Sequence, residues 1–327
     1  MTTPILRWGL LSTANINNAL IPPLTVSKRN KLVAVASRLQ EKADAYAHEK
    51  KIKRAYGSYE ALLADPEIDV IYNPLPNHLH AEWSLKAVDA GKHVFCEKPL
   101  ALSLADVDAM AAASSRTGKL IAEAFAYRAH PHMQKVKEII NSGKLGKLKM
   151  VHGSFTFFMT RQDDIRLDPA MGGGALWDIG CYPLSFTRML LGTEPLEVFG
   201  WQVTSPSGVD EVFAGQLRFP GDITFQLDCS FRIPSHEFME IVGDEGTLSV
   251  PKPFNNGARK NLYLTRAGKT STIVVKGPDP YLAEVENFAD AILFNKLPVT
   301  SLADSRLNTA AILALLESAK TGKPVTL

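Results

Sequence analysis

The sequence predicts a doubly wound α/β domain with a parallel sheet, followed by an α+β domain with an open, largely antiparallel sheet. In the first third of the 327-residue chain, short continuous apolar runs alternate with longer amphipathic ones. That alternation is typical of strands that are buried on both faces and separated by helices. From about Lys147 onward, apolar residues recur at every second position, as in strands with one covered face. The chain is long enough for two such cores.

The elements of the first domain follow from these runs. The predicted buried strands are residues 5–11, 32–36, 70–72, 93–96 and 120–125. Helical patterns occupy residues 81–90 and 105–115. Strand and helix in alternation predict a first domain over residues 1–125.

The second domain is expected over residues 126–327. One long helix is predicted at residues 174–190, ahead of strands at 213–219, 224–231, 238–242, 262–264 and 272–275. Glycine-containing turn signals at 220–222, 243–246 and 267–268 separate those strands. Amphipathic segments at 281–295 and 303–320 close the chain, and this helical region is a candidate to pack back on the first domain.

Charge and cysteine content exclude several classes of protein. The formal net charge is +2 and no basic stripe is visible, so neither nucleic acid nor a membrane surface is an expected partner. Cys96, Cys181 and Cys229 form no C-x-x-C pair, which disfavours a disulfide framework and a zinc site, and no metal is expected. The N-terminus does not read as a signal peptide, and no apolar run is long enough to span a membrane. We therefore expect a cytoplasmic protein.

Residues 9–14 follow the first predicted strand and resemble a dinucleotide fingerprint. In the pattern G-x-G-x-x-G/A, glycines permit a tight turn and close approach of the backbone to pyrophosphate. Gly9 and Ala14 fit this pattern, whereas Leu11 replaces the middle glycine, so an ordinary strand-to-loop turn is the alternative. Polar side chains at a helix start can bind phosphate, which favours a Rossmann nucleotide site. The cofactor-binding candidates here are Gly9, Leu11, Ser12, Thr13, Ala14, Asn15 and Ile16.

The end of the second strand predicts the choice of nucleotide. Ser37 and Arg38 stand where NAD-binding domains carry an acidic residue for the ribose 2′-hydroxyl. A guanidinium pairs with a 2′-phosphate through two parallel hydrogen bonds. We therefore expect NADP as the cofactor, with NAD and an ordinary surface arginine as the alternative.

Four further motifs occur in a characteristic order. They are Glu97-Lys98-Pro99, residues 75–80, residues 126–131 and residues 172–182. Together they resemble the glucose-fructose oxidoreductase / inositol dehydrogenase / rhizopine catabolism (Gfo/Idh/MocA) family over essentially the whole chain. Residues 165–169 and Tyr182 are most similar to the branch of dimeric dihydrodiol dehydrogenases and NADP-dependent xylose dehydrogenases. Many family members carry histidine in place of Tyr182, so this departure favours a Lys/Tyr site.

Lys98 and Tyr182 are the predicted acid–base pair. A tyrosine hydroxyl can exchange a proton with a substrate hydroxyl if its pKa falls below about 10, and a nearby ammonium favours the phenolate. The resemblance implies that Lys98 lies beside the nicotinamide ribose and the substrate oxygen. Asp178 lies four residues before Tyr182 on the predicted helix and can orient a polyol. The alternatives are a surface salt bridge from Lys98 to Glu97, a carboxylate favoured by the helix dipole and a core aromatic ring.

The remaining site candidates rest mainly on the resemblance. Those expected near the cofactor are Leu75, Pro76, Asn77, His80, Glu97, Arg128 and Arg166; His80 is also a candidate proton relay, although a lone histidine is more often structural. Those expected near the substrate, besides Lys98, Asp178 and Tyr182, are Tyr127, Phe158 and Tyr281, with Arg161 on weaker grounds. His130 and His132 are interpreted as local structure or as the rim of a substrate pocket.

These predictions favour an NADP-dependent dehydrogenase or reductase acting on a sugar, polyol or trans-diol. Two alternatives stay open: an NAD-dependent glycosidase, which the same family contains, and a non-catalytic dinucleotide-binding sensor. A binding module has no need of a proton donor, so Lys98 and Tyr182 disfavour the sensor. We expect a homodimer through the C-terminal sheet, because apolar residues such as Phe213, Phe225 and Phe231 need burial.

Overall fold

The chain divides into two compact units. The structure is a computed structural model that describes residues 4–161, 163–255 and 257–327. Unit 1 consists of Met1–Ala129 and Asp279–Arg306, and unit 2 consists of His130–Pro278 and Leu307–Leu327. Unit 1 therefore includes a segment from the C-terminal part of the chain.

A parallel sheet forms the centre of unit 1. Its strands are β1 (Leu6–Leu11), β2 (Asn30–Ala36), β3 (Arg54–Tyr56), β4 (Val70–Asn73), β5 (His93–Glu97) and β6 (Ile121–Ala124). They are ordered β3-β2-β1-β4-β5-β6, and each neighbouring pair is parallel. The order reverses at β1, so the predicted doubly wound sheet is confirmed. The sequence did not predict β3, a short strand that is only half-buried.

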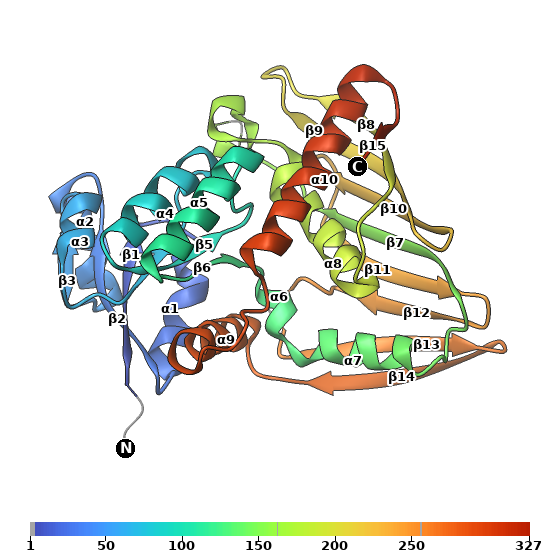
Figure 1. Cartoon of the computed structure of the whole chain (residues 1–327), viewed down its shortest axis with the longest axis horizontal. Helices are drawn as coiled ribbons and strands as arrows, with labels where there is room; N and C mark the ends of the chain where they lie inside the picture. Colours follow the sequence, from blue (N-terminus) through green and yellow to red (C-terminus); the bar gives the residue numbers. More distant parts are fainter. Residues whose placement is uncertain (1–3, 162, 256) are drawn as a thin grey trace. The chain divides into compact units, whose positions relative to one another are not determined.

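Helices cover both faces of this sheet (Figure 1). On one face, Leu11 and Ile71 pack with α3 (Tyr59–Ala64), α4 (His80–Asp89) and α5 (Leu104–Thr117). On the other, Leu10 and Val70 pack with α1 (Asn17–Val26), α2 (Gln40–Lys50) and α9 (Pro280–Phe294). Short turns of helix, η1 (Asn77–Leu79) and α6 (Ala126–Ala129), follow β4 and β6. The second face is thus completed by α9, which follows β6 by more than a hundred residues.

Aromatic rings join α9 to the centre of the sheet. The Phe288 ring of α9 lies 5.0 Å from that of Phe95 and 6.0 Å from that of Trp8. The rings of Trp8 and Phe95 are in turn 5.9 Å apart, edge to face. All three are at most 3% exposed. Such rings bury large apolar areas, so this contact contributes strongly to the stability of unit 1.

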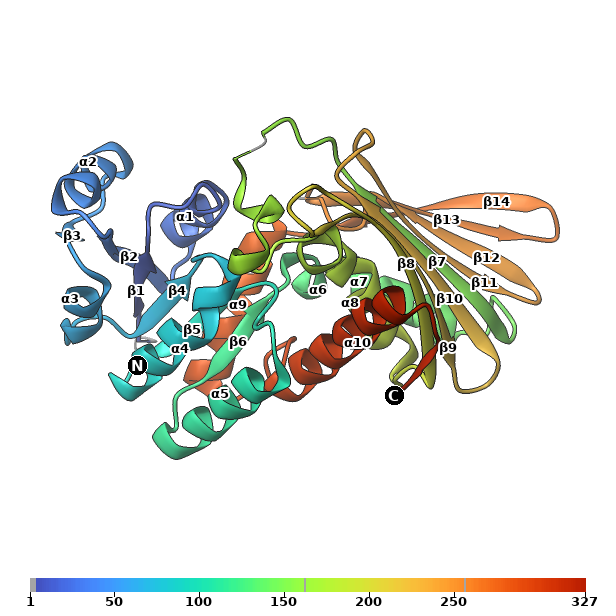
Figure 2. The same cartoon turned by 90° about the horizontal axis from the view of Figure 1, so that it is seen from above.

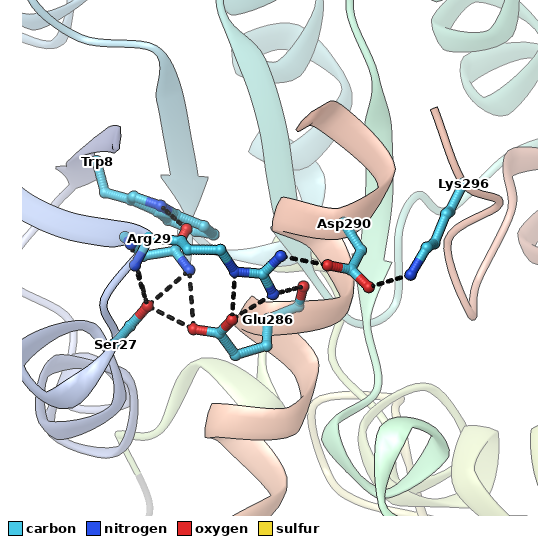
Figure 3. Close-up of polar contacts among 7 residues, drawn as sticks. Trp8, Ser27, Arg29, Glu286, Asp290 and Lys296 are labelled. Atoms are coloured by element: carbon cyan, nitrogen blue, oxygen red, sulfur yellow. Dashed lines mark hydrogen bonds and ion pairs between the residues drawn. The ribbon is translucent and has the colours of Figure 1, made fainter. Parts of the chain in front are cut away.

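A polar network beside these rings connects the segment between α1 and β2 to the same helix, α9 (Figure 3). The Arg29 guanidinium donates to Glu286 through Nε at 2.8 Å and also pairs with Asp290. Ser27 donates its hydroxyl proton to Glu286, and Asp290 also accepts from Lys296 at 2.8 Å. The indole of Trp8 donates to Asn30 at 2.9 Å, which links the network to the aromatic cluster.

Unit 2 is built on a second, larger sheet (Figure 2). Its strands are β7 (Leu148–Thr156), β8 (Glu197–Thr204), β9 (Asp210–Phe219), β10 (Ile223–Ser230), β11 (His236–Gly243), β12 (Gly246–Pro251), β13 (Arg259–Arg266), β14 (Lys269–Lys276) and β15 (Val325–Thr326). They are ordered β14-β13-β12-β11-β7-β10-β9-β8-β15. The sheet is largely antiparallel, as predicted, but β7 and β10 pair in parallel, which the period-two pattern could not reveal. The sequence reading missed β7, β8, β12 and β15.

One face of this sheet is covered within the chain. It packs against α7 (Pro131–Asn141), α8 (Cys181–Leu191) and the part of α10 (Leu302–Thr321) that belongs to unit 2. Phe213, Phe225 and Phe231 are at most 2% exposed. The reason given for a dimer was therefore wrong, because these rings are already buried by the chain itself.

The predicted single helix at residues 174–190 is two elements. A π-helical turn, η4 (Leu176–Gly180), precedes α8. Pro183 lies in the first turn of α8, and a proline ring in an α-helix clashes with the carbonyl four residues earlier. The wider π-helical turn accommodates such a ring, and turns of this kind are frequent at functional sites.

Within the described residues, no helix combines the length and the hydropathy that a membrane crossing requires.

We predict that Arg29→Ala destabilises unit 1 by about 1–3 kcal/mol, because it removes the guanidinium from two partly buried carboxylates, of which Asp290 keeps Lys296 as a partner. Chemical denaturation followed by tryptophan fluorescence measures this, since Trp8 belongs to the same network. Arg116→Ala is the matched control, because Arg116 pairs with Asp89 on the surface of the same unit, where an ion pair contributes little. Equal unfolding midpoints for the two variants would contradict the prediction.

Candidate functional site

The carboxyl edge of the parallel sheet gathers most of the predicted cofactor residues. Leu11 ends β1 and residues 12–16 follow it, Ser37 and Arg38 follow β2, and residues 75–80 follow β4. Glu97 ends β5, and Lys98 is the next residue. Because parallel strands end at the same edge, the fold brings these segments together, at the place where open α/β sheets bind ligands.

The fingerprint turn has an unusual backbone. Gly9 lies inside β1, where a Cβ atom would come within 3.2 Å of the side chains of Leu62 and Ile68. This glycine therefore permits close packing of the strand against its neighbours. The left-handed position of the turn is taken by Ser12, with φ of 97°. Its amide donates to the Ala36 carbonyl at 3.0 Å, and its hydroxyl accepts from the Ala14 amide at 3.2 Å.

These bonds place the fingerprint turn beside the end of β2. Ser37 is buried and donates its amide to the Tyr56 carbonyl at 3.0 Å, whereas Arg38 is exposed. A fixed backbone with an exposed guanidinium fits an adenosine 2′-phosphate outside the strand end. Thr13, Ala14 and Ile16 are half-buried, and Asn15 is exposed at the start of α1.

His80 lies beneath the loop that follows β4. Its side chain is buried, with Nδ1 2.7 Å from the Pro99 carbonyl oxygen and Nε2 2.7 Å from the Leu75 carbonyl oxygen. Burial lowers the pKa of His80 to about 4, so the ring is neutral near pH 7 and donates to one carbonyl at a time. The structure thus places His80 as a link between the two loops, while Pro76 and Asn77 lie half-buried above it.

Glu97 lies in a group of acidic side chains. Its carboxylate accepts from the Tyr72 hydroxyl at 2.5 Å, and it contributes to a raised pKa of the fully buried Glu284 on α9. Burial first and Glu97 second raise the pKa of Tyr72 well above its usual value. Burial first and Glu97 second likewise raise the pKa of Glu284, which favours its neutral form. Lys98, which follows Glu97, is half-buried and precedes a cis peptide bond to Pro99.

Arg128 and Tyr127 are buried inside unit 1. The Arg128 guanidinium forms an ion pair with Asp304 and lies over the Phe125 ring at 5.6 Å. Although burial opposes it, Tyr127 and Asp304 raise the pKa of Arg128. The Tyr127 ring packs edge to face on Phe125, with centroids 5.9 Å apart. Tyr281, in the first turn of α9, is half-buried.

In unit 2 the glycine run shapes the turn that carries the predicted substrate residues. The run follows two short 3-10 turns, η2 (Ile165–Leu167) and η3 (Pro169–Met171). A Cβ atom on Gly173 would lie 2.4 Å from the Arg166 carbonyl oxygen, so no side chain fits there. Gly172 and Gly174 have φ of 77° and 125°. The run therefore allows the backbone to turn sharply into η4.

Asp178 and Arg166 meet at this turn. The Arg166 Nε donates to an Asp178 oxygen at 2.6 Å, and the Arg166 Nη1 donates to an Asp164 oxygen at 3.2 Å. Asp178, foremost among the causes, raises the pKa of Arg166. A carboxylate has four acceptor positions, so Asp178 can bind the guanidinium and still accept a substrate hydroxyl.

Tyr182 lies in the first turn of α8, and its ring packs against two phenylalanines. The Phe155 and Phe254 rings each lie 5.3 Å from it, and they stack on each other at 5.4 Å. Tyr182 is half-buried. Its ring therefore has the aromatic neighbours that the core-aromatic alternative expects, although the residue is not fully buried.

The other candidates of unit 2 lie in more exposed or more buried positions. Phe158 is 61% exposed in the loop after β7, where Arg161 pairs with Asp163 on the surface. His130 and His132 are buried with their Nδ1 atoms 2.9 Å apart, and burial lowers the pKa of His132 to about 3.

The sequence did not identify Glu123 of unit 1 and Asp210 of unit 2, both of which are buried acids. Glu123 accepts from the Leu100 amide at 2.9 Å, and burial raises the pKa of this carboxyl to about 7. An acidic residue within an apolar strand was a visible signal for it. Asp210 accepts from the Leu176 amide at 2.7 Å, across 34 residues of sequence, and no local pattern pointed to that contact.

Comparison with known proteins agrees with this geometry. Residues 6–125 match the model of the "Oxidoreductase family, NAD-binding Rossmann fold", and residues 133–249 match the "GFO/IDH/MocA C-terminal domain". The chain is 37% identical over 326 residues to D-xylose 1-dehydrogenase (NADP(+)) 2 of Haloferax volcanii, covering 98% of this chain and 100% of the relative. It is 34% identical over 249 residues to trans-1,2-dihydrobenzene-1,2-diol dehydrogenase of Danio rerio, covering 75% and 74% of the two chains.

A solved structure shares the fold over nearly the whole chain. It is a 3-ketoreductase from Actinomadura kijaniata in complex with NADP and TDP-benzene, with a TM-score of 0.91, 27% identity and coverage of 96% and 98%. Other solved structures of that enzyme carry a tyrosine-to-phenylalanine or a lysine-to-alanine replacement. With the predicted fold confirmed in both units and both family models matched, the chain belongs to the Gfo/Idh/MocA family and is an oxidoreductase with an NAD-binding Rossmann domain.

Proposed function

We propose that this oxidoreductase uses NADP to move a hydride to or from a carbinol carbon of a sugar, polyol or trans-diol. The observation that carries the proposal is the turn at residues 174–182, which carries the Asp178 carboxylate and the half-buried Tyr182 on adjacent turns of one helical segment. The relatives' names include a xylose and a trans-dihydrodiol dehydrogenase, and both substrates carry vicinal hydroxyls.

The residues at the carboxyl edge of unit 1 fit a dinucleotide. In this proposal, the turn at Ser12 and the start of α1 bind the pyrophosphate, and Arg38 binds the 2′-phosphate. The bound nicotinamide supplies or accepts the hydride. Leu75, Pro76 and Asn77 line the cofactor on the β4 side, and His80 fixes their loop through the Leu75 carbonyl.

Tyr182 is the proposed proton donor and acceptor. In the reductive direction its hydroxyl protonates the developing alkoxide, and in the oxidative direction the phenolate takes the hydroxyl proton. The Lys98 ammonium favours the phenolate, and Asp178 accepts a second substrate hydroxyl. In the related ketoreductase, the replaced lysine and tyrosine are as far apart in sequence as Lys98 and Tyr182, which supports this assignment.

A substrate panel tests the proposal. Aldoses, ketoses and trans-diols are each mixed with NADP or NAD, and the absorbance of the reduced nicotinamide is followed. Reduced cofactor that accumulates in proportion to product supports a dehydrogenase. Bond cleavage in a glycoside without net reduction would instead identify a glycosidase, and binding without any turnover would identify a sensor.

Arg38→Ala should weaken NADP binding by about 10- to 150-fold and leave NAD binding nearly unchanged, because only NADP carries the 2′-phosphate. Titration of both cofactors by calorimetry measures the two affinities. Lys42→Ala, which removes a charge from the nearby exposed face of α2, is the control. Equal losses for NADP and NAD in Arg38→Ala would exclude the phosphate contact.

Tyr182→Phe keeps the ring that packs against Phe155 and Phe254 and should lower turnover by about 10²–10⁴-fold with cofactor affinity unchanged. Lys98→Met should move the pH optimum for oxidation upward, because the positive charge that favours the phenolate is gone. A double-mutant cycle on turnover measures whether the two residues act together, since they belong to different units. Near-full activity of Tyr182→Phe would assign the proton to another group.

We also propose a homodimer through the uncovered face of the second sheet. That face includes Trp201 and Val203 of β8, which are 58% and 47% exposed. Exposed apolar groups on a sheet face favour association between copies. Sedimentation at micromolar concentration should show a dimer, and Trp201→Glu should shift it toward monomer. A wild-type protein that sediments as a monomer would contradict this.

A further inference from the structure

The carboxylate of Asp210 lies at the start of the turn that carries the proposed substrate residues. Asp210 is the first residue of β9 and is 4% exposed. Its Oδ2 accepts from the Leu176 amide at 2.7 Å, and the Ala175 amide also bonds to the carboxylate. Amides at a helix start have no partner within the helix, so an acidic side chain there satisfies them and faces the positive end of the helix dipole.

The last glycine of the run is fitted to this carboxylate. A Cβ atom on Gly174 would lie only 2.2 Å from Asp210 Oδ1, and φ of Gly174 is 125°. Both facts require glycine at this position. The Gly174 amide donates to the Arg166 carbonyl at 2.9 Å, so the backbone is held between Asp210 on one side and the η2 turn on the other.

The backbone that these contacts hold continues directly into the proposed substrate residues, Asp178 and Tyr182. The Asp178 amide donates to the Gly174 carbonyl at 3.0 Å, and the Asp178 carboxylate accepts from Arg166 at 2.6 Å. Tyr182 follows one turn later. A shift at Leu176 therefore moves both proposed substrate contacts.

We propose that Asp210 is a positioning residue, whose carboxylate fixes the turn that carries Asp178 and Tyr182. The proposal rests on the function proposed above, because it assigns those two residues to the substrate. A carboxylate suits the task since both of its oxygens accept, whereas an asparagine turns an NH₂ group toward one of the two backbone donors.

The surroundings of Asp210 make its charge sensitive to pH near neutrality. Burial raises the pKa of Asp210 to about 7, although the Leu176 and Ala175 amides oppose this. Cys229 on β10 interacts electrostatically with Asp210 and also with Asp228 on β10, Cys181 on α8 and Asp178 on η4, and Arg166 is paired to Asp178. As the pH falls through 7, Asp210 gains a proton and loses the charge that the amides stabilise. Turnover should fall with it.

Asp210→Asn tests the proposal, with Glu211→Gln as the matched control. Glu211 is the next residue of β9, so it points to the opposite face, where Arg232 donates to it at 2.8 Å. We expect Asp210→Asn to lower kcat about 10- to 100-fold with the KM for NADP unchanged, and to lose the acidic limb near pH 7. Glu211→Gln should keep the wild-type kcat and the acidic limb of the pH profile.

A second measurement is made on the wild-type protein and does not depend on activity. The Leu176 amide resonance of the wild-type protein, followed by nuclear magnetic resonance, should titrate near pH 7, and this titration should be absent in Asp210→Asn. An amide that does not titrate in the wild type, or an Asp210→Asn enzyme with full turnover and an unchanged pH profile, would overturn the proposal. If Tyr182→Phe retains activity while the Leu176 amide titrates with Asp210, the proposed role of Tyr182 is wrong. The contact by which Asp210 positions the turn is then still supported.

Discussion

Burial of the second face of the parallel sheet by α9 is the constraint on which unit 1 depends. Trp8 and Phe95 project from central strands, and Phe288 of α9 packs against both rings. The Arg29 network fixes the same helix to the β1–β2 edge. Because α9 follows the whole strand-rich segment of unit 2 in sequence, the nucleotide-binding unit is complete only when nearly the entire chain has been made. A boundary drawn at residue 125 would leave large apolar rings exposed.

That constraint also organises the cofactor side of the site. The helices on both faces fix the strands, so the strand ends at Leu11, Ala36, Asn73 and Glu97 present their loops at one edge. Loop-to-loop bonds then set their positions: Ser12 binds the Ala36 carbonyl, and His80 reaches the carbonyls of Leu75 and Pro99. The polar groups of these loops are thus ordered by the fold, which is the preorganisation that binding and catalysis require.

Both units contain buried titratable groups whose shifted pKa values act on stability in opposite directions. Glu123 and Asp210 keep their protons up to about pH 7 in the folded chain. Stability therefore falls as the pH rises from the pKa that these carboxyls have in the unfolded chain to about 7. His80 and His132 stay neutral in the folded chain, because their pKa values are lowered. Stability therefore also falls when the pH drops below the pKa that these histidines have in the unfolded chain. Buried groups with shifted pKa values are more frequent at functional sites, where position matters more than stability.

The sequence by itself determined the alternation of strands and helices in unit 1, the antiparallel character of unit 2 and the family, because these follow from hydrophobic period and from local motifs. It also identified the residues at the strand ends, since Lys98 directly follows β5 and Ser37 and Arg38 follow β2. Only the tertiary structure decided which partners those residues meet. The parallel pairing of β7 with β10, the burial of Phe213 and Phe225 and the contact of Asp210 with Gly174 join segments that are distant in sequence. No local pattern encodes such contacts, because they arise from the packing of whole elements against one another.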